Sequence, residues 1–310
     1  MLSLMLAGLL AAAAPTASEV TLSGGAASLH GTMLAPEGSP RAVALILPGS
    51  GPTDRNGDSP LGVRGATYRL LGEALAADGI ATVRIDKRGI GASAAAAPPE
   101  SELRFTTFVE DARAWAADTV ARTGLPCVWL VGHSEGAQIA LAAVEGGNDT
   151  VCGVVLLAGA GRSASVVIRE QLEAGLPEPL KSQAFAVLTE LEAGRTVADS
   201  PPQLAALFRP SVQPYLISWL PMDPAALAAA YDGPMLIVQG DNDLQIKVAD
   251  AQALAAAQPR ARLSILEGVN HLLKTAPTDR AGNAATYADP SLPLAPGVAE
   301  AVAGFILEPR

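Results

Sequence analysis

Short apolar runs alternate with longer helical patterns along most of the chain. This alternation is typical of repeated strand–helix units, which build a mainly parallel sheet with helices packed against it. The runs that predict strands are Glu19–Leu22, Ser28–Leu34, Ala42–Leu47, Ala81–Ile85, Val128–Val131, Val154–Ala158, Met235–Gln239 and Arg262–Leu266. The helical patterns are Thr67–Asp78, Thr107–Arg122, Ala137–Glu145, Val248–Ala257 and Pro296–Ile306. The sequence therefore predicts an α/β fold with an eight-stranded, mostly parallel sheet.

The first two predicted strands are joined differently from the others. Only a short segment containing Gly24-Gly25 separates them, with no helix between. A glycine pair between two strands is typical of a tight hairpin turn. We therefore expect an antiparallel hairpin at one edge of the sheet.

One long segment interrupts the alternation, because no strand-like run occurs between Arg162 and Pro224. Such a segment is too long for a plain loop in a compact domain. Gly and Pro separate three helical patterns within it, at Val166–Ala174, Leu180–Glu192 and Pro202–Phe208. We predict that residues 162–224 form a helical cap over the carboxyl edge of the sheet, where open α/β sheets bind ligands. Residues 18–161 and 225–310 would then form the core.

The N-terminal segment has the features of a signal peptide, predicted here as residues 1–17. It is apolar for about the length of a signal h-region, is followed by small residues, and is too short to span the bilayer, which takes ~20 residues. It lacks a basic n-region beyond the α-amine, so a mis-assigned start or a buried helix is the alternative. We expect a periplasmic or secreted protein. No later stretch is long and apolar enough for a membrane helix, so no stable span is expected after signal removal.

Composition and charge narrow the class of protein. The 310 residues are 49% apolar, which is ample for a large core and argues against disorder. The formal net charge is −10, and no basic run or basic-aromatic patch occurs, which argues against a nucleic-acid partner. The sequence leaves the oligomeric state open.

The two cysteines fit an oxidising compartment. Cys127 immediately precedes one predicted strand, and Cys152 lies just before the next. If these strands are parallel neighbours, both cysteines lie at the same end of the sheet, within bridging distance. A disulfide and two buried free thiols both remain open, and neither cysteine is placed for catalysis.

The most informative motif is Gly132-His133-Ser134-Glu135-Gly136, a G-x-S-x-G sequence between a predicted strand and a helix. In that context the glycines allow a strained turn that projects the serine hydroxyl above the end of the strand. Ser134 is therefore the candidate nucleophile. A serine nucleophile needs a general base and a third group that orients the base.

The small number of histidines in the chain identifies the candidate base. The chain has three histidines; His30 precedes the serine within a strand near the sheet edge, and His133 is adjacent to it and cannot easily face its hydroxyl. His271 follows a predicted strand and remains as the candidate. Two acids, Asp241 and Asp243, follow the preceding strand. We favour Asp243, because its place in the loop suits a carboxylate reaching back to the histidine, whereas Asp241 suits a turn cap.

Two segments are candidates for the oxyanion hole, which needs preorganised N–H donors. One donor is the backbone N–H of Glu135, directly after the serine. The other is expected in the loop Pro48-Gly49-Ser50-Gly51-Pro52, with the Ser50 N–H preferred over that of Gly51. This loop does not have the spacing of a phosphate-binding P-loop. Asp241-x-Asp243 also does not fit a calcium loop, because Ile246 occupies the position that needs glycine.

Taken together, these motifs resemble the α/β-hydrolase superfamily, and within it the serine aminopeptidase-like group of bacterial esterases and lipases. The resemblance runs from about Leu29 to Ile306. The motifs that carry it, in chain order, are Pro48–Gly57, Asp86–Ser93, Gly132–Gly136, Gly240–Asp243 and Asn270-His271. In resembling proteins the Asp86–Ser93 turn is structural, and Asp86 and Arg88 brace the loops around the site. We therefore expect no catalysis from it.

The sequence accordingly predicts a serine hydrolase with Ser134, His271 and Asp243 as its triad and no cofactor or metal. The expected activity is that of a carboxylesterase acting on small-molecule esters with short or medium acyl groups. An aminopeptidase or amidase, or an acyltransferase, could use the same triad. An aminopeptidase would need carboxylates for the substrate amine, and the candidate cap residues are Glu170, Glu173, Glu190 and Glu192. A non-catalytic binding protein is disfavoured, because no triad member is missing.

Overall fold

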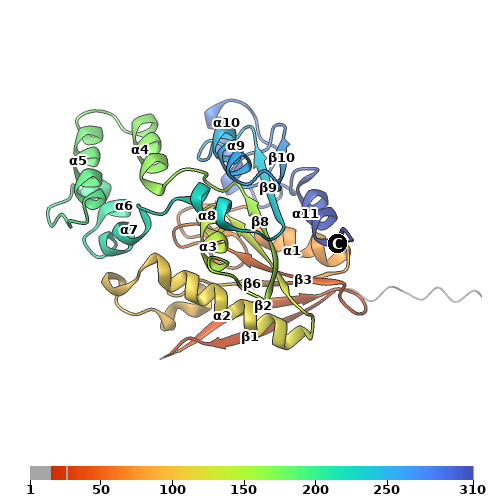
Figure 1. The fold of residues 1–310 in the computed structure, drawn as a ribbon. Coiled ribbons are helices and arrows are strands. Elements are labelled where there is room, and N and C mark those ends of the chain that lie inside the picture. Colours follow the sequence, from red (N-terminus) through yellow and green to blue (C-terminus); the bar gives the residue numbers. More distant parts are fainter. Residues whose placement is uncertain (1–14, 26, 310) are drawn as a thin grey trace, which may run out of the picture.

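The computed structural model describes residues 15–25 and 27–309. Most of the predicted signal peptide, residues 1–14, therefore lies outside the described residues. An eight-stranded sheet forms the centre of the fold, in the order β1-β2-β6-β3-β7-β8-β9-β10 (Figure 1). Its strands are β1 (Thr16–Ser23), β2 (Ser28–Ala35), β3 (Ala42–Leu47), β6 (Ile80–Ile85), β7 (Val128–His133), β8 (Val151–Leu157), β9 (Met235–Gly240) and β10 (Arg262–Leu266).

Most neighbouring strands of this sheet are parallel, as the sequence predicts. Strands β6, β3, β7, β8, β9 and β10 run in one direction, and β2 pairs antiparallel with both β1 and β6. The predicted edge hairpin is confirmed, with β1 as the outer strand. The eight predicted strands correspond to the eight strands of the sheet.

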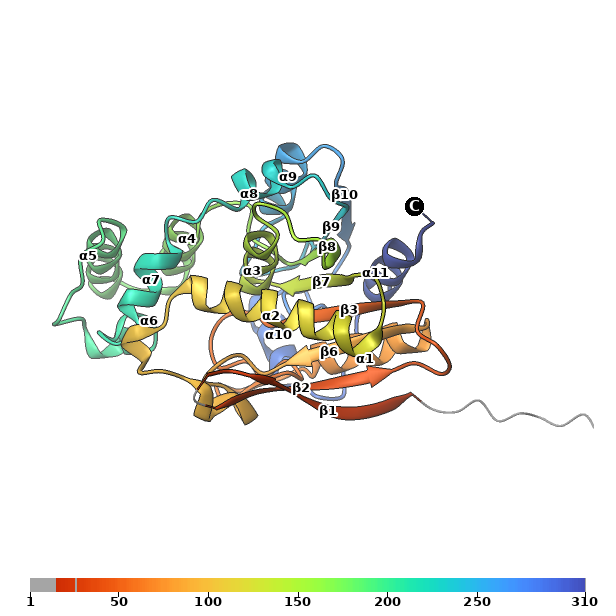
Figure 2. The ribbon, with the colours of Figure 1, turned by 60° about the horizontal axis from the view of Figure 1, so that its bottom comes forward.

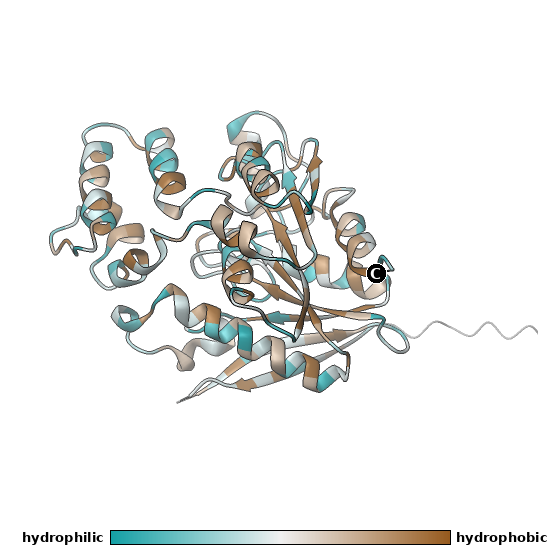
Figure 3. Cartoon of the chain, viewed as in Figure 1, coloured by the Kyte–Doolittle hydropathy of each residue, from teal (hydrophilic) through white to brown (hydrophobic). Residues whose placement is uncertain are grey.

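Helices cover both faces of the sheet (Figure 2). The longer core helices are α1 (Thr67–Ala77), α2 (Phe105–Thr123), α3 (Glu135–Ala143), α9 (Val248–Ala257) and α11 (Val298–Leu307). Because side chains alternate along a strand, β3 contributes to two separate cores. Val43, Leu45 and Leu47 pack in the cluster that contains α2 and α3, whereas Ala44 and Ile46 pack in the cluster with α1 and α11. The apolar strands at the centre of the fold are visible in Figure 3.

A group of helices lies between β8 and β9, in the segment where the sequence predicts a cap. They are α4 (Ala164–Gly175), α5 (Leu180–Glu192), α6 (Ala205–Phe208), α7 (Gln213–Trp219) and α8 (Pro224–Ala230). In Figure 1, α4 to α7 extend beyond one side of the sheet. Helix α7 contacts the core, because the Trp219 indole N–H donates to Gln138 Oε1 on α3 at 2.5 Å and the Phe105 N–H donates to Ser218 Oγ. The division of the chain into core and cap remains a prediction.

The periodicity did not predict several short elements. They are the two-stranded hairpin β4 (Asp58–Ser59) and β5 (Val63–Arg64), the helices α7, α8 and α10 (Arg280–Ala285), and the short 3-10 segments at Gly91–Ala96, Glu100–Glu102 and Thr286–Ala288. The helix predicted at Pro202–Phe208 is present as a 3-10 segment, Pro202–Leu204, followed by α6. Elements of two to seven residues contain too few positions to show a period. No helix within 15–25 and 27–309 is both long and apolar enough to cross a membrane.

The two cysteines meet at the amino ends of neighbouring parallel strands. Cys127 directly precedes β7, Cys152 is the second residue of β8, and the two strands pair in parallel. Their sulfurs form a disulfide, with the Cα atoms 5.2 Å apart. Of the two alternatives that the sequence left open, the structure therefore has the bridge.

Candidate active site

Five loops converge at the carboxyl edge of the parallel strands. They follow β3, β6, β7, β9 and β10 and carry Gly49, Lys87, Ser134, Asp243 and His271, respectively. Parallel neighbours present their carboxyl ends at the same edge of a sheet, which is where open α/β sheets bind ligands. Residues far apart in the sequence are therefore brought together here by the topology.

Ser134 occupies a strained turn between β7 and α3. Its φ of 54° and ψ of −119° lie in a region that residues with a side chain rarely adopt. The flanking glycines permit this turn, because a Cβ on Gly132 would lie 2.1 Å from the Gly136 carbonyl oxygen, and one on Gly136 would lie 2.2 Å from that of Leu47. Only residues without a Cβ fit both positions. The predicted elbow geometry is present.

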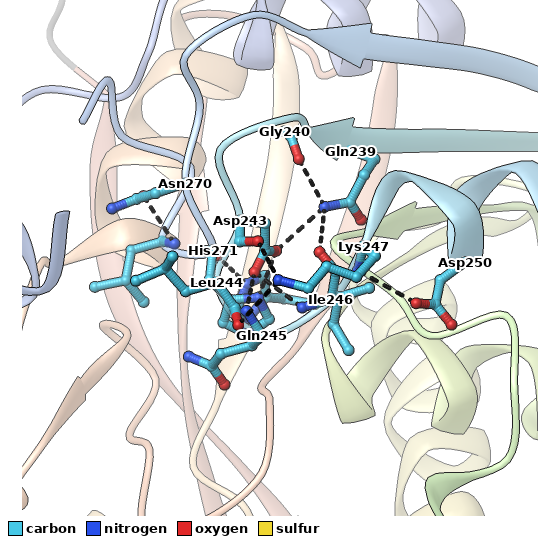
Figure 4. A network of polar contacts seen from close by, with 12 residues as sticks. Gln239, Gly240, Asp243, Leu244, Gln245, Ile246, Lys247, Asp250, Asn270 and His271 are labelled. Atoms are coloured by element: carbon cyan, nitrogen blue, oxygen red, sulfur yellow. Dashed lines mark hydrogen bonds and ion pairs between the residues drawn. The ribbon is translucent and has the colours of Figure 1, made fainter. Parts of the chain in front are cut away.

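His271 and Asp243 form a buried pair (Figure 4). The Nδ1 of His271 lies 2.7 Å from Asp243 Oδ2, and the side chains are 5% and 0% exposed, respectively. The other carboxylate oxygen of Asp243 accepts the N–H groups of Gln245 at 2.7 Å and Ile246 at 3.0 Å. Because both oxygens are engaged, the carboxylate has a fixed orientation toward the imidazole.

The pKa of Asp243 is lowered despite its burial. Burial acts to raise the pKa of this carboxyl, but the charge of His271 and its hydrogen bond outweigh it, together with the N–H groups of Ile246 and Gln245. Asp243 is therefore held as a carboxylate beside the imidazole. It can stabilise a positive charge that develops on His271.

Two residues support this pair without having been predicted. The Gln239 side-chain amide donates to Asp243 Oδ2 at 3.2 Å from the end of β9 (Figure 4). The Asn270 side-chain oxygen accepts the N–H groups of Leu272 and Lys274, and so closes the turn that carries His271. No sequence pattern marks Gln239, because its contact with Asp243 depends on the path of the following loop.

The alternative candidates for the acid and the base have other contacts. Asp241 accepts the N–H of Gly268 at 2.7 Å and so braces a turn, as the sequence suggested. His30 lies in β2, and its backbone N–H donates to Ser93 Oγ. His133 is buried, and both of its ring nitrogens are engaged in hydrogen bonds with Tyr68 and the His271 backbone.

These hydrogen bonds join the loop after β3, helix α1, the end of β7 and the loop after β10. The N–H of Gly49 lies 2.9 Å from Tyr68 Oη, and Tyr68 Oη lies 2.8 Å from His133 Nδ1. The Nε2 of His133 lies 2.8 Å from the His271 carbonyl oxygen. A carbonyl oxygen only accepts, so Nε2 carries the proton and Tyr68 donates to Nδ1. Burial lowers the pKa of His133 to about 3, and the charge of His271 adds to the effect, so the ring is neutral.

The two predicted oxyanion segments lie beside the elbow. A Cβ placed on Gly49 would lie 3.2 Å from Ser134 Cβ, so the loop after β3 approaches the serine closely. Among the described residues, the backbone N–H groups of Ser50 and Glu135 make no hydrogen bond to another protein group. Both N–H groups are therefore available to an external acceptor. Within 15–25 and 27–309, no group of three or more His, Cys, Asp or Glu residues is arranged to hold a metal ion.

The turn after β6 braces neighbouring loops, as the resemblance implied. Asp86 accepts the backbone N–H of Arg55 at 2.8 Å and its guanidinium at 2.9 Å. Arg88 forms an ion pair with Asp111 on α2. Lys87, between them, is buried and reaches toward the elbow instead. No sequence motif predicted a role for Lys87.

Comparison with known proteins shows which proteins this chain resembles. Residues 62–199 match the family model described as serine aminopeptidase, S33. Esterase EstD of Thermotoga maritima is 25% identical over 259 residues, which are 82% of this chain. The chain spans 59% of the length of that curated relative.

Two solved structures share the fold. Est1E from Butyrivibrio proteoclasticus, solved with ferulic acid bound, has a TM-score of 0.60 and 16% identity over 93% of this chain and 96% of Est1E. Proline iminopeptidase from Mycobacterium smegmatis has a TM-score of 0.56 and 16% identity over 82% of this chain and 92% of that enzyme. The chain therefore has the α/β-hydrolase fold of these structures. Its residues 62–199 resemble the serine aminopeptidase group, as the motifs suggested.

Proposed function

We propose that this protein is a serine hydrolase, with Ser134 as nucleophile, His271 as general base and Asp243 as the acid that orients the base. The observation that carries the proposal is the buried hydrogen bond between His271 and Asp243 at the edge where Ser134 emerges. A strained serine, a histidine and a buried carboxylate in this chain order are the parts of a nucleophilic triad.

The chemistry would proceed in two halves. His271 Nε2 takes the Ser134 proton as Oγ attacks the ester carbonyl, and the Ser50 and Glu135 N–H groups bind the oxygen that becomes negative. The C–O bond to the alcohol then breaks, and His271 gives its proton to the leaving alkoxide. In the second half, His271 deprotonates a water molecule that attacks the acyl-enzyme. The carboxylic acid leaves, and Ser134 regains its proton.

Ester cleavage is favoured over aminopeptidase activity by the charges of the predicted cap. An aminopeptidase needs a carboxylate that is free to bind the substrate ammonium. Each candidate carboxylate already forms an ion pair, in the pairs Glu170–Arg162, Glu173–Lys181, Glu190–Arg195 and Glu192–Arg169. These pairs support a neutral substrate, and the likeness to an esterase supports the same choice.

The acyl group would lie between the elbow and α7. Trp219 on α7 donates to Gln138 on α3, one turn beyond Ser134. Tyr215, also on α7, is buried; its pKa is raised well above the ordinary value by burial and then by the negative charge of Glu135. Helix α7 therefore packs against the first turn after the nucleophile. We propose that its packing sets the preferred acyl length, in the short to medium range.

Parallel rate measurements test the activity. The purified protein would be assayed on acyl nitrophenyl esters of increasing chain length and on aminoacyl nitroanilides, beside Ser134→Ala and the surface control Ser182→Ala. We expect ester hydrolysis that peaks at a short or medium chain, is retained in Ser182→Ala and is lost in Ser134→Ala. Faster anilide cleavage would favour the aminopeptidase, transfer to an added alcohol would favour the acyltransferase, and no turnover would favour a binding protein.

We also propose that the protein is exported and loses its N-terminal segment. The Cys127–Cys152 disulfide supports an oxidising compartment, where such bonds persist. N-terminal sequencing of the protein recovered from the periplasm or medium should begin near residue 18. Recovery of the intact chain from the cytosol with free thiols would contradict export.

A further inference from the structure

Lys87 reaches the loop that precedes the proposed oxyanion donor. It follows β6 and is 7% exposed, with its Nζ 2.6 Å from the carbonyl oxygen of Gly49. The same Nζ lies 3.3 Å from Glu135 Oε1 and 5.4 Å from the ring centre of Phe108. One buried ammonium thus binds both segments that carry the proposed oxyanion donors.

The geometry of the peptide bond makes the first contact significant. The Gly49 carbonyl and the Ser50 N–H belong to the same planar trans peptide, so they point in opposite directions. A donor that holds the carbonyl therefore also fixes the direction of the N–H. Gly49 has no side chain to restrict its backbone, so this peptide plane can rotate unless something holds it.

Gly49 is held from both sides. Its own N–H donates to Tyr68 Oη at 2.9 Å, and its carbonyl accepts from Lys87 at 2.6 Å. Its close approach to Ser134 leaves little room for a larger residue that could restrict the backbone instead. The side chains of Tyr68 and Lys87 therefore restrict the backbone of Gly49, as its own side chain would at another residue.

The second contact of Lys87 balances its charge. A buried ammonium is costly unless a counter-charge lies close, and Glu135, at 5% exposure, supplies that counter-charge. The backbone N–H of Glu135 is the other proposed oxyanion donor. Lys87 thereby links the start of α3 to the loop after β3 through one side chain.

We propose that Lys87 is a positioning residue that aligns the oxyanion hole by holding the Gly49–Ser50 peptide against the elbow. The proposal rests on the function proposed above. Lys87 acts on the side of the peptide away from the substrate and touches no reacting atom. A misdirected Ser50 N–H would weaken binding of the negative oxygen, which exists only in the transition state, and would leave ester binding largely unchanged.

The test uses Lys87→Met, Lys87→Arg, Glu135→Gln and the double variant Lys87→Met/Glu135→Gln, with the surface substitution Lys181→Met as control. Lys87→Met leaves the Glu135 carboxylate buried without its cation, which destabilises the fold. The double variant removes both charges together and keeps the experiment interpretable. Unfolding temperature, kcat and KM on one nitrophenyl ester, and inhibition by an alkyl boronic acid and by the carboxylate product would be measured for each.

We expect kcat of the double variant to fall about 10- to 100-fold with KM nearly unchanged, because removal of a whole oxyanion donor costs about 10²- to 10³-fold. Affinity for the boronic acid, which mimics the tetrahedral state, should fall in parallel, and affinity for the carboxylate product should not. Lys87→Arg should recover part of the loss, since a guanidinium can also donate to Gly49. The loss of kcat in the double variant should exceed the loss in Glu135→Gln alone. Lys181→Met should keep kcat close to wild type.

A folded double variant with wild-type kcat and boronic acid affinity would overturn the role of Lys87, because charge balance alone would then explain its burial. Equal losses in kcat and in product binding would overturn it as well. Failure of the proposed function differs from failure of the role of Lys87, since the wild-type protein itself would then hydrolyse no ester.

Discussion

His133 Nε2 lies 2.8 Å from the carbonyl oxygen of His271, and the two imidazole rings lie 4.8 Å apart. The residue before the proposed nucleophile is therefore bound to the backbone of the proposed base. This hydrogen bond connects the end of β7 to the loop after β10, next to the proposed nucleophile and base. A charged His133 beside His271 would repel the imidazolium that forms during catalysis, so its neutrality matters to the site.

The neutral state of His133 predicts a specific loss of stability in acid. Its pKa in the folded protein is lowered to about 3, below the 6.5 expected when unfolded. As the pH falls from about 6.5 to about 3, the unfolded chain takes up a proton that the folded protein does not, so stability is lost in this window. The loss amounts to roughly 3 kcal/mol between pH 7.5 and 4.5.

Urea unfolding of wild type and His133→Gln at these two pH values measures this contribution. Glutamine can accept from Tyr68 and donate to the His271 carbonyl, but it does not titrate. The stability of His133→Gln should therefore fall less on acidification, by the amount given above. Equal losses in the two proteins would show that His133 is not held neutral.

The role of Asp243 predicts a loss of activity with the fold retained. Asp243→Asn keeps the size of the side chain but removes the charge that stabilises an imidazolium, so kcat should fall about 10³- to 10⁴-fold. Asp241→Asn is the matched control, because Asp241 lies two residues earlier and accepts only from the turn at Gly268. Steady-state kinetics and circular dichroism of both variants check the prediction. A large loss in Asp241→Asn alone would exchange the two assignments.

The disulfide is expected to stabilise the fold without affecting the site. Cys127 and Cys152 are 25 residues apart in sequence and lie at the amino ends of β7 and β8, whereas Ser134 follows the carboxyl end of β7. Closing a loop of that length contributes about 3 to 4 kcal/mol by the chain-entropy relation. The double substitution Cys127→Ala/Cys152→Ala should unfold at lower urea concentration and keep its kcat well below its melting temperature. A reduced kcat in the folded variant would link the bridge to the site.

The elements predicted correctly are those whose sequence pattern reflects local physics. Central parallel strands such as β3 are continuous apolar runs because both of their faces are buried. The predicted boundaries of β3, β10, α5 and α9 match the structure. The elbow at Ser134 was recognisable because its strained turn requires glycine on both sides. Such requirements act over a few neighbouring residues and are therefore visible in the sequence.

The supporting residues were not predictable, because their roles depend on contacts across the fold. Tyr68 and Gly49 are 19 residues apart, and Lys87 and Glu135 are 48 apart. Each lies in an ordinary sequence context, and only the shared carboxyl edge of the sheet brings it to the site. In the sequence, Gln239 is only the last residue of a predicted strand. In the structure, the following loop places Asp243 beside its amide.

The most direct test of the central proposal is covalent labelling with a fluorophosphonate, followed by mass spectrometry of the intact protein and its peptides. Only a serine activated by a base attacks the phosphorus and displaces fluoride at an appreciable rate. We predict one label per chain, on Ser134, with labelling lost in Ser134→Ala and strongly slowed in Asp243→Asn. No labelling of the folded wild-type protein, or labelling at another residue, would contradict the assignment of Ser134 as the nucleophile.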